Sequence, residues 1–201
     1  VSYAGLTLGD LIPDLLAQGR FLPVTPGTRY ITVGGAIAAD VHGKNHHRDG
    51  AFGDHVRWID LVTADGQCRR LSRDGSVQDQ RFFYSTLGGM GLTGVIIRAC
   101  FDTISAPTSA VRVDTDRFND LDSLMSAMVT GDDNYRYSVA WIDGTARGAK
   151  LGRGVLTRGD HADVDEMRGA LPKAVPTGAQ PRLASPDTRR PARRCGAARR
   201  G

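Results

Sequence analysis

The chain has 201 residues, of which 40% are hydrophobic and 24% charged, so it is long and apolar enough to bury a core. It contains no run of about 18 apolar residues, which excludes a membrane-spanning helix, and its three cysteines are too widely spaced for a disulfide framework or a thiolate metal site. Residues 171–201 carry a net charge of +7 and the remainder −3, so the overall +4 does not indicate nucleic-acid binding by the folded part.

The first predicted element is an amphipathic helix that begins after Thr7, a residue type favoured at helix N-caps. Gly19 is a plausible end, and Pro13 should kink or weaken the helix. The apolar residues with helical spacing are Leu8, Leu11, Ile12, Leu15 and Leu16. Residues 21–24 then predict a short extended piece before a turn at residues 26–27.

A glycine-rich segment follows at residues 30–53. Gly34 and Gly35 open a run of small residues, 36–39, that predicts a short helix. The backbone N–H groups from Gly34 to Ala36 would be able to bind phosphate oxygens there. The alternative is a tight turn before a closely packed helix, and the pattern is neither GxGxxG nor a P-loop.

The polar loop VHGKNHH, residues 41–47, has three interpretations. A zinc site is disfavoured because no carboxylate or cysteine lies at a familiar spacing. A solvated polar loop is the second. In the third, His42 and Lys44 supply donors or positive charge to a cofactor or substrate, because donor-rich loops between glycines often line a site.

A β-hairpin is predicted next, from strand-forming residues 55–64, an Asp65-Gly66 turn and returning residues 67–71. Residues 79–86 predict a short helix. The second glycine-rich loop, residues 87–94, leads into a buried-type strand at 95–101. Taken alone, that loop is also consistent with a simple helix-to-strand connection.

Beyond Pro107 the pattern predicts a strand at 111–113, a helix at 118–128 and a strand at 135–142, the start of a second α+β domain. From Leu171 onward the chain contains no aromatic residue, and Pro, Ala, Gly and Arg dominate. We expect this tail to be disordered and to offer only non-specific phosphate attraction. Its composition also suggests a GC-rich gene translated out of frame.

The order and spacing of these motifs carry a resemblance. PGTRYITVGGAIAADVHGKNHH (26–47), FGDHV (52–56), a hairpin and FFYSTLGGMGLTGVI (82–96) together resemble the FAD-binding domain of the vanillyl-alcohol-oxidase (PCMH-type) family. Within that family they are similar to the flavin-dependent oxidases of decaprenylphosphoryl-β-D-ribose. The resemblance runs from about Gly5 to Arg158.

The resemblance implies an α+β fold. Residues 1–105 would form the second subdomain of a PCMH-type FAD-binding domain, 106–170 the start of an α+β substrate domain, and 171–201 the Arg/Pro-rich tail. FAD would be bound without a covalent link, and no metal is implied. His42 and Lys44 would face the isoalloxazine and the substrate as catalytic residues. The implied cofactor-binding residues are Gly27, Thr32, Val33, Gly34, Gly35, Ala39, Asp40, Val41, His42 and Ile96.

The implied reaction oxidises the 2′-hydroxyl of a decaprenylphosphoryl ribofuranose to a ketone, with hydride passing to the flavin. A nicotinamide-dependent reductase subunit would complete the epimerisation used in cell-wall arabinan synthesis. The implied partners are therefore a polyprenyl-phosphoryl sugar and this reductase, with no specific nucleic acid. The implied location is the cell envelope, with peripheral membrane contact through the lipid substrate.

Three departures from the family pattern lead us to expect a fragment. The family's first phosphate-binding loop, an Arg-x-x-Gly-x-Ser segment, would precede Val1, and its later Lys, Gln and Cys pocket residues are replaced by the tail. Val139 stands where a small residue is usual. We therefore expect weak or no FAD binding by this polypeptide. The alternative functions are an aldonolactone or alditol oxidase and an inactive remnant of such an enzyme.

Overall fold

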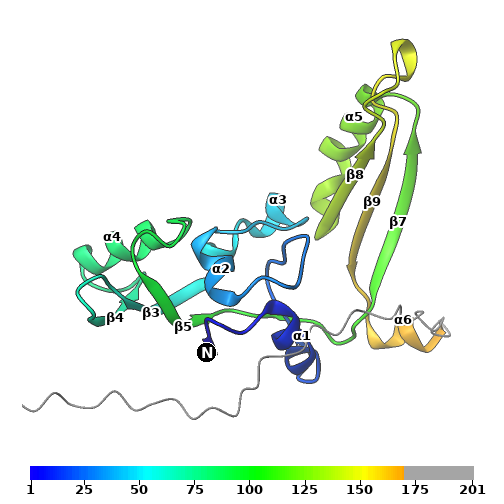
Figure 1. Cartoon of the computed structure of the whole chain (residues 1–201). Coiled ribbons are helices and arrows are strands. Elements are labelled where there is room, and N and C mark those ends of the chain that lie inside the picture. The colour runs from blue at the N-terminus through cyan, green and yellow to red at the C-terminus, as the bar shows by residue number, and fades with distance from the viewer. Residues whose placement is uncertain (170–201) are drawn as a thin grey trace, which may run out of the picture. The chain divides into compact units, whose positions relative to one another are not determined.

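A computed structural model describes residues 1–169, which belong to one compact unit built from three antiparallel sheets (Figure 1). The first sheet has the order β1-β5-β3-β4. Its strands are β1 (Ser2–Tyr3), β3 (Val56–Val62), β4 (Cys68–Ser72) and β5 (Val95–Phe101). The predicted hairpin is confirmed, because β3 and β4 pair antiparallel on either side of Gly66, whose φ of 76° suits glycine.

The main core lies between this sheet and the helices α2 (Val33–Ala38) and α4 (Val77–Thr86). Ile59 and Leu61 of β3 alternate with more polar residues and are fully buried, as expected for one covered face of a sheet. Phe52, Phe83 and Leu71 pack into the same cluster. Phe52 lies in a short 3-10 helix, Phe52–His55.

The helix α1 (Leu8–Leu16) begins where the sequence predicts. Thr7 and Asp10 form a reciprocal capping box, in which Asp10 N donates to Thr7 Oγ1 over 3.1 Å. Pro13 is accommodated within the helix, although proline has no N–H and therefore one helical carbonyl lacks its usual donor. The strand β2 (Arg20–Phe21) follows α1 along the chain. It pairs antiparallel with β6 (Ile104–Ser105) in a two-stranded sheet.

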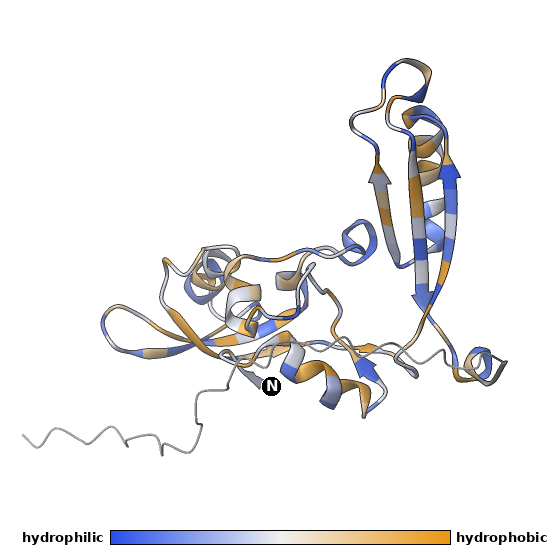
Figure 2. Cartoon of the chain, turned by 45° about the vertical axis from the view of Figure 1, so that its right-hand side comes forward, coloured by the Kyte–Doolittle hydropathy of each residue, from blue (hydrophilic) through white to orange (hydrophobic). Residues whose placement is uncertain are grey.

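The third sheet has the order β7-β9-β8, with strands β7 (Val111–Phe118), β8 (Tyr137–Ile142) and β9 (Gly154–His161). The helix α5 (Leu121–Gly131) covers one face, where Leu124 and Leu156 are buried. In Figure 2, β7 is coloured mainly as hydrophilic and β8 carries more hydrophobic positions. The other short helices are α3 (His46–Asp49), Asp132–Asn134, Gly148–Lys150 and α6 (Val164–Gly169).

The sequence-based boundaries are wrong at three places. Phe118, predicted to start a helix, ends β7, and α5 starts only after the N-cap Asp120. The helix α2 starts at Val33 because the Thr32 hydroxyl accepts a hydrogen bond from Gly35 N. The strand β9 was not predicted. The boundary near residue 105 stays a prediction, and the predictions for 171–201 lie outside the described residues.

Candidate flavin site

The two glycine-rich segments meet at one pocket of about 410 Å³. The start of α2 contributes Thr32, Gly34 and Gly35, and the loop after α4 contributes Gly91 and Gly94. The remaining lining residues are Ala4, Gly5, Ala38, Thr86, Val95 and Ile96. Three predicted cofactor-binding positions and Ile96 are thus brought together with glycines for which no individual role was predicted.

The glycines of this pocket leave room that protein atoms do not fill. A Cβ at Gly5 would meet nothing within 4 Å, and one at Gly35 would meet only the Thr32 hydroxyl at 3.2 Å. Glycine inside a helix such as α2 costs about 0.5–1 kcal/mol relative to alanine. Packing therefore does not explain Gly5, and it explains Gly35 only through the Thr32 hydroxyl, whereas a flat ligand lying against the backbone would account for both glycines. The bare surface fits a dinucleotide cofactor in this respect.

Other glycines in the pocket have a structural reason. A Cβ at Gly34 would be tight against Ala4, only 3.2 Å from its carbonyl oxygen. At Gly94, where φ is 148°, a Cβ would come within 2.4 Å of the Val62 carbonyl oxygen on β3. These glycines let the two segments approach the sheet closely and so shape the pocket wall.

The N–H groups at the start of α2, predicted to bind phosphate, have partners within the chain in this structure, and their role stays a prediction. Gly34 N donates to Ala4 O over 2.8 Å, and Gly35 N donates to Thr32 Oγ1 over 3.0 Å. Ala36 N donates to Thr32 O over 2.8 Å. Since these donors are already used, contact between α2 and a ligand would be by backbone surface rather than by donated hydrogen bonds.

Four predicted cofactor residues lie outside the linings of the pockets described here. The side chain of Val33 is fully buried in the core. Ala39, Asp40 and Val41 connect α2 to the polar loop. Asp40 adopts φ of 43°, and its carboxylate accepts a 2.7 Å hydrogen bond from Gly53 N. Residues 39–41 therefore form the connection between α2 at the first pocket and the polar loop that lines the second pocket.

The hydroxyl Oγ1 of Thr93, in the second glycine-rich loop, is buried and has no hydrogen-bond partner within residues 1–169. Its neighbours Gly91 and Gly94 line the pocket, but Thr93 does not. The unpaired hydroxyl costs free energy, and its burial keeps it away from a ligand in this pocket.

A second pocket, of about 640 Å³, gathers the other predicted residues. Gly27, His42 and Lys44 all line it, together with Tyr137 and Ser138 of β8. The remaining lining residues are Thr25, Pro26, Gly43, His46, Met128, Val139 and Ala140. The polar loop is joined to β8 directly, because Ser138 N donates to Lys44 O over 2.9 Å.

Buried polar groups hold the polar loop in place. Asn45 is fully buried, and its amide donates to Pro23 O over 2.7 Å and to Asp49 Oδ2 over 2.6 Å. Arg136 donates to the same Asp49 oxygen over 2.7 Å. The backbone of Lys44 is thereby fixed between a buried amide and β8. Within residues 1–169 no cluster of three metal-ligating side chains occurs.

The hydroxyl of Tyr137 lies 3.1 Å from His161 Nε2 at the side of this pocket. Burial raises the pKa of Tyr137 to about 12, so the phenol is neutral at physiological pH. Burial, and secondarily the Arg136 charge, lowers the pKa of His161 below its usual value. The pair therefore offers a neutral hydroxyl rather than a charge.

Comparison with known proteins finds similarity over part of the chain. A model described as an FAD binding domain matches residues 2–72. Residues 2–72 include the α2 side of the first pocket and the polar loop of the second. The predicted α+β fold class and FAD cofactor are confirmed by this match.

The similar proteins include an oxidase, a dehydrogenase and an uncharacterized protein. A decaprenylphosphoryl-beta-D-ribose oxidase from Mycolicibacterium smegmatis is 43% identical over 85% of this chain and 37% of its own length. An uncharacterized Streptomyces coelicolor protein is 39% identical over 90% of the chain and 48% of its length. A D-lactate dehydrogenase from Anaerostipes hadrus is 30% identical over 54% of the chain and 23% of its length. The chain thus spans less than half the length of these relatives.

Proposed function

We propose that this chain provides part of the FAD site and part of the substrate pocket of an FAD-dependent oxidase. The observation that carries the proposal is the single pocket shared by Gly35 and the loop of Gly91 and Gly94. Its unfilled glycine surface fits a dinucleotide. When bound, FAD supplies the hydride acceptor, and the chain's residues bind and orient the reactants.

The proposed substrate is decaprenylphosphoryl-β-D-ribose, the compound in the name of the Mycolicibacterium smegmatis relative. The group that would be oxidised is its 2′-hydroxyl. Lys44 and His42 would line its pocket, where the Lys44 ammonium attracts the phosphate and His42 contacts the sugar. The neutral Tyr137 phenol would donate or accept a hydrogen bond without adding charge. The proposed partner is a nicotinamide-dependent reductase that reduces the resulting ketone, and the proposed location is the cell envelope.

FAD binding is tested by NMR titration of the labelled chain up to millimolar FAD, a range that covers the weak binding we expect. The amides of Gly35, Gly91 and Gly94 should shift first. Gly35→Leu should reduce affinity at least about tenfold with little change in stability, because the better helix propensity of leucine offsets the 3.2 Å approach of its Cβ to the capping Thr32 hydroxyl. Gly144→Leu, at a turn position where a Cβ meets nothing within 4 Å, is the matched control. Equal affinity of both variants would contradict the proposed site.

The substrate proposal is tested separately with a short-chain polyprenyl-phosphoryl ribose. It should shift the amides of His42 and Ser138 and bind more weakly to Lys44→Ala by about tenfold, as expected for loss of a charge-assisted phosphate contact. Arg81→Ala, which removes a cation from α4, is the control. Unchanged binding by Lys44→Ala would reject this substrate pocket while leaving the FAD site standing.

A further inference from the structure

A third pocket, of about 310 Å³, adjoins the second pocket, in which His42 and Lys44 lie. The two pockets have part of the polar loop and part of β8 as a common wall. The residues that line both are Thr25, Lys44, Tyr137, Ser138 and Val139. A ligand held in the second pocket can therefore extend into the third.

The floor of the third pocket is the face of the third sheet that α5 does not cover. Because strand side chains alternate, and Leu156 lies beneath α5, the odd-numbered residues of β9 occupy this open face. The registers place Gly159 between Val113 of β7 and Tyr137 of β8. Gly159 has a structural reason, since a Cβ there would lie 2.5 Å from Arg112 O. The row across the sheet is thereby hollow at its centre.

Apolar and aromatic side chains surround this hollow. Val111 and Val113 are 45% and 51% exposed, and both line the pocket. Phe21 contacts His161 edge to face, with ring centroids 5.3 Å apart, and Tyr137 contacts His161 in the same way at 5.7 Å. We call this the apolar pocket, after its lining residues Leu16, Phe21, Val111, Val113 and Val139.

The two cations that line the apolar pocket differ in their partners. Arg158 donates to Asp116 over 2.9 Å, and its side chain is only 12% exposed. Lys44 is exposed and forms no ion pair within residues 1–169. Lys44 therefore brings a free ammonium group to the boundary between the polar second pocket and the apolar pocket.

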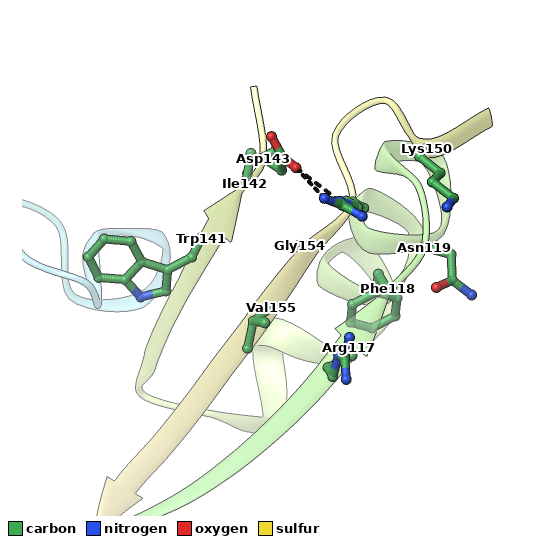
Figure 3. Close-up of a pocket in the computed structure, with 10 residues that line it drawn as sticks. Arg117, Phe118, Asn119, Trp141, Ile142, Asp143, Lys150, Gly154 and Val155 are labelled. Atoms are coloured by element: carbon green, nitrogen blue, oxygen red, sulfur yellow. Dashed lines mark hydrogen bonds and ion pairs between the residues drawn. The ribbon is translucent and has the colours of Figure 1, made fainter. Parts of the chain in front are cut away.

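The other end of the same sheet face is less suited to hydrocarbon. Figure 3 shows the pocket at that end, where Arg117 and Lys150 are among the lining residues. Asp143 and Arg153 also line it and form an ion pair at 2.8 Å, drawn as dashed lines. An apolar chain that covered these charged groups would remove them from water at a cost in free energy. The apolar pocket accommodates such a chain without this cost.

A polyprenyl-phosphoryl ribose has the same order of groups: a polar sugar, an anionic phosphate and a hydrocarbon chain. We propose that the apolar pocket binds the isoprene units next to the phosphate, while Lys44 pairs with the phosphate and the ribose occupies the second pocket. This inference rests on the proposed function, because it takes the substrate to be a polyprenyl-phosphoryl sugar. Pockets for drug-sized ligands measure about 300–1,000 Å³, so the apolar pocket holds only the first isoprene units of a long chain.

Two probes separate the sugar phosphate from the hydrocarbon chain. Ribose 1-phosphate and geranylphosphoryl-β-D-ribose are each titrated into the labelled full chain and followed by NMR. Both probes should shift the amides of His42 and Ser138. The geranyl probe alone should also shift the amides of Val113 and Gly159. Its affinity should be at least about tenfold higher than that of ribose 1-phosphate, because its chain is removed from water.

Substitution of Val113 tests the floor of the apolar pocket. Val113→Asn adds no charge and should weaken binding of the geranyl probe about tenfold, because a polar amide replaces apolar surface. Val113→Thr keeps the β-branched shape that suits a strand and should weaken it about threefold. Val129→Asn, at an 82% exposed position on α5, is the matched control and should change neither affinity by more than about twofold. Ribose 1-phosphate should bind all three variants as it binds the unmodified chain.

Two results would overturn the assignment of the apolar pocket. One is the absence of shifts at Val113 and Gly159 with the geranyl probe up to millimolar concentration, whatever ribose 1-phosphate does. The other is a set of shifts at Trp141 and Val155 instead, which would direct the chain to the charged end of the face.

Failure of the proposed substrate pocket gives a different result. Ribose 1-phosphate would then leave the amides of His42 and Ser138 unshifted. Shifts of Val113 and Gly159 by the geranyl probe would in that case still support a site for an apolar chain.

Discussion

Arg136 donates a 2.7 Å hydrogen bond to Asp49 and thereby ties the segment before β8 to the helix α3. The two side chains are only 24% and 14% exposed, and Asp49 also accepts from Asn45. The polar loop that carries His42 and Lys44 therefore depends on residues far along the chain. This network gives the candidate substrate pocket one fixed wall.

Removing Arg136 should destabilise the fold measurably. Arg136→Ala leaves a mostly buried carboxylate without its cation, so we expect a loss of about 2 kcal/mol in the free energy of unfolding. Urea denaturation monitored by circular dichroism measures it. Arg69→Ala breaks the Asp65–Arg69 pair, whose side chains are each 49% exposed, and should cost under about 0.5 kcal/mol. Equal losses of unfolding free energy in both variants would show that the Arg136–Asp49 pair stabilises the fold no more than an exposed ion pair does.

Two glycines of the second pocket should respond differently to alanine. A Cβ at Gly43 would lie 2.6 Å from Asn45 Oδ1 and 2.7 Å from Thr25 O, so Gly43→Ala should cost about 1–3 kcal/mol and displace the loop. A Cβ at Gly27 meets nothing within 4 Å, so Gly27→Ala should be near neutral. Thermal and urea unfolding of the pair measure the difference. Comparable stability of the two variants would contradict the described packing of Gly43.

Tyr137 should make the protein sensitive to alkali. Its folded-state pKa is raised to about 12 by burial, above the ordinary value of 10.0. The unfolded chain therefore releases this proton first, and stability falls as pH rises from about 10 to about 12. Tyr137→Phe should remove that part of the slope, measured as urea midpoints against pH. An unchanged slope would place the ionisation elsewhere.

His161 should make the stability of the protein sensitive to acid. Burial, followed by the Arg136 charge, lowers its pKa from 6.5, so the folded state favours the neutral imidazole. Stability is then fully present above about pH 6.5 and is lost as pH falls through the lower folded-state value. Unfolding measured from pH 8 to pH 5 should show a smaller acid loss in His161→Gln than in the unmodified chain. A steeper loss in the variant would reverse this sign.

Local patterns predicted the elements whose signals lie within a few residues. The Thr7 cap and the Asp65-Gly66 turn each follow from neighbours a few positions apart, and the helix predicted at 79–86 is found as α4, although its Ser76 cap was not predicted. Phe118 was misplaced because apolar spacing alone extends a helix backwards through a strand end. The strand β9 was missed because its glycines and charged residues weaken a strand pattern that pairing on both sides stabilises.

The sequence alone determined the resemblance to FAD binding domains, the α+β class and the two glycine-rich segments. Only the tertiary structure decided that these segments share one pocket, and that Val33 belongs to the core. It also decided that Ala4 and Thr32 already use the donors of α2. The physical reason is that the positions of the glycines show where the backbone must carry no side chain. Which backbone group accepts each hydrogen bond depends instead on segments that meet only when apolar surface is buried.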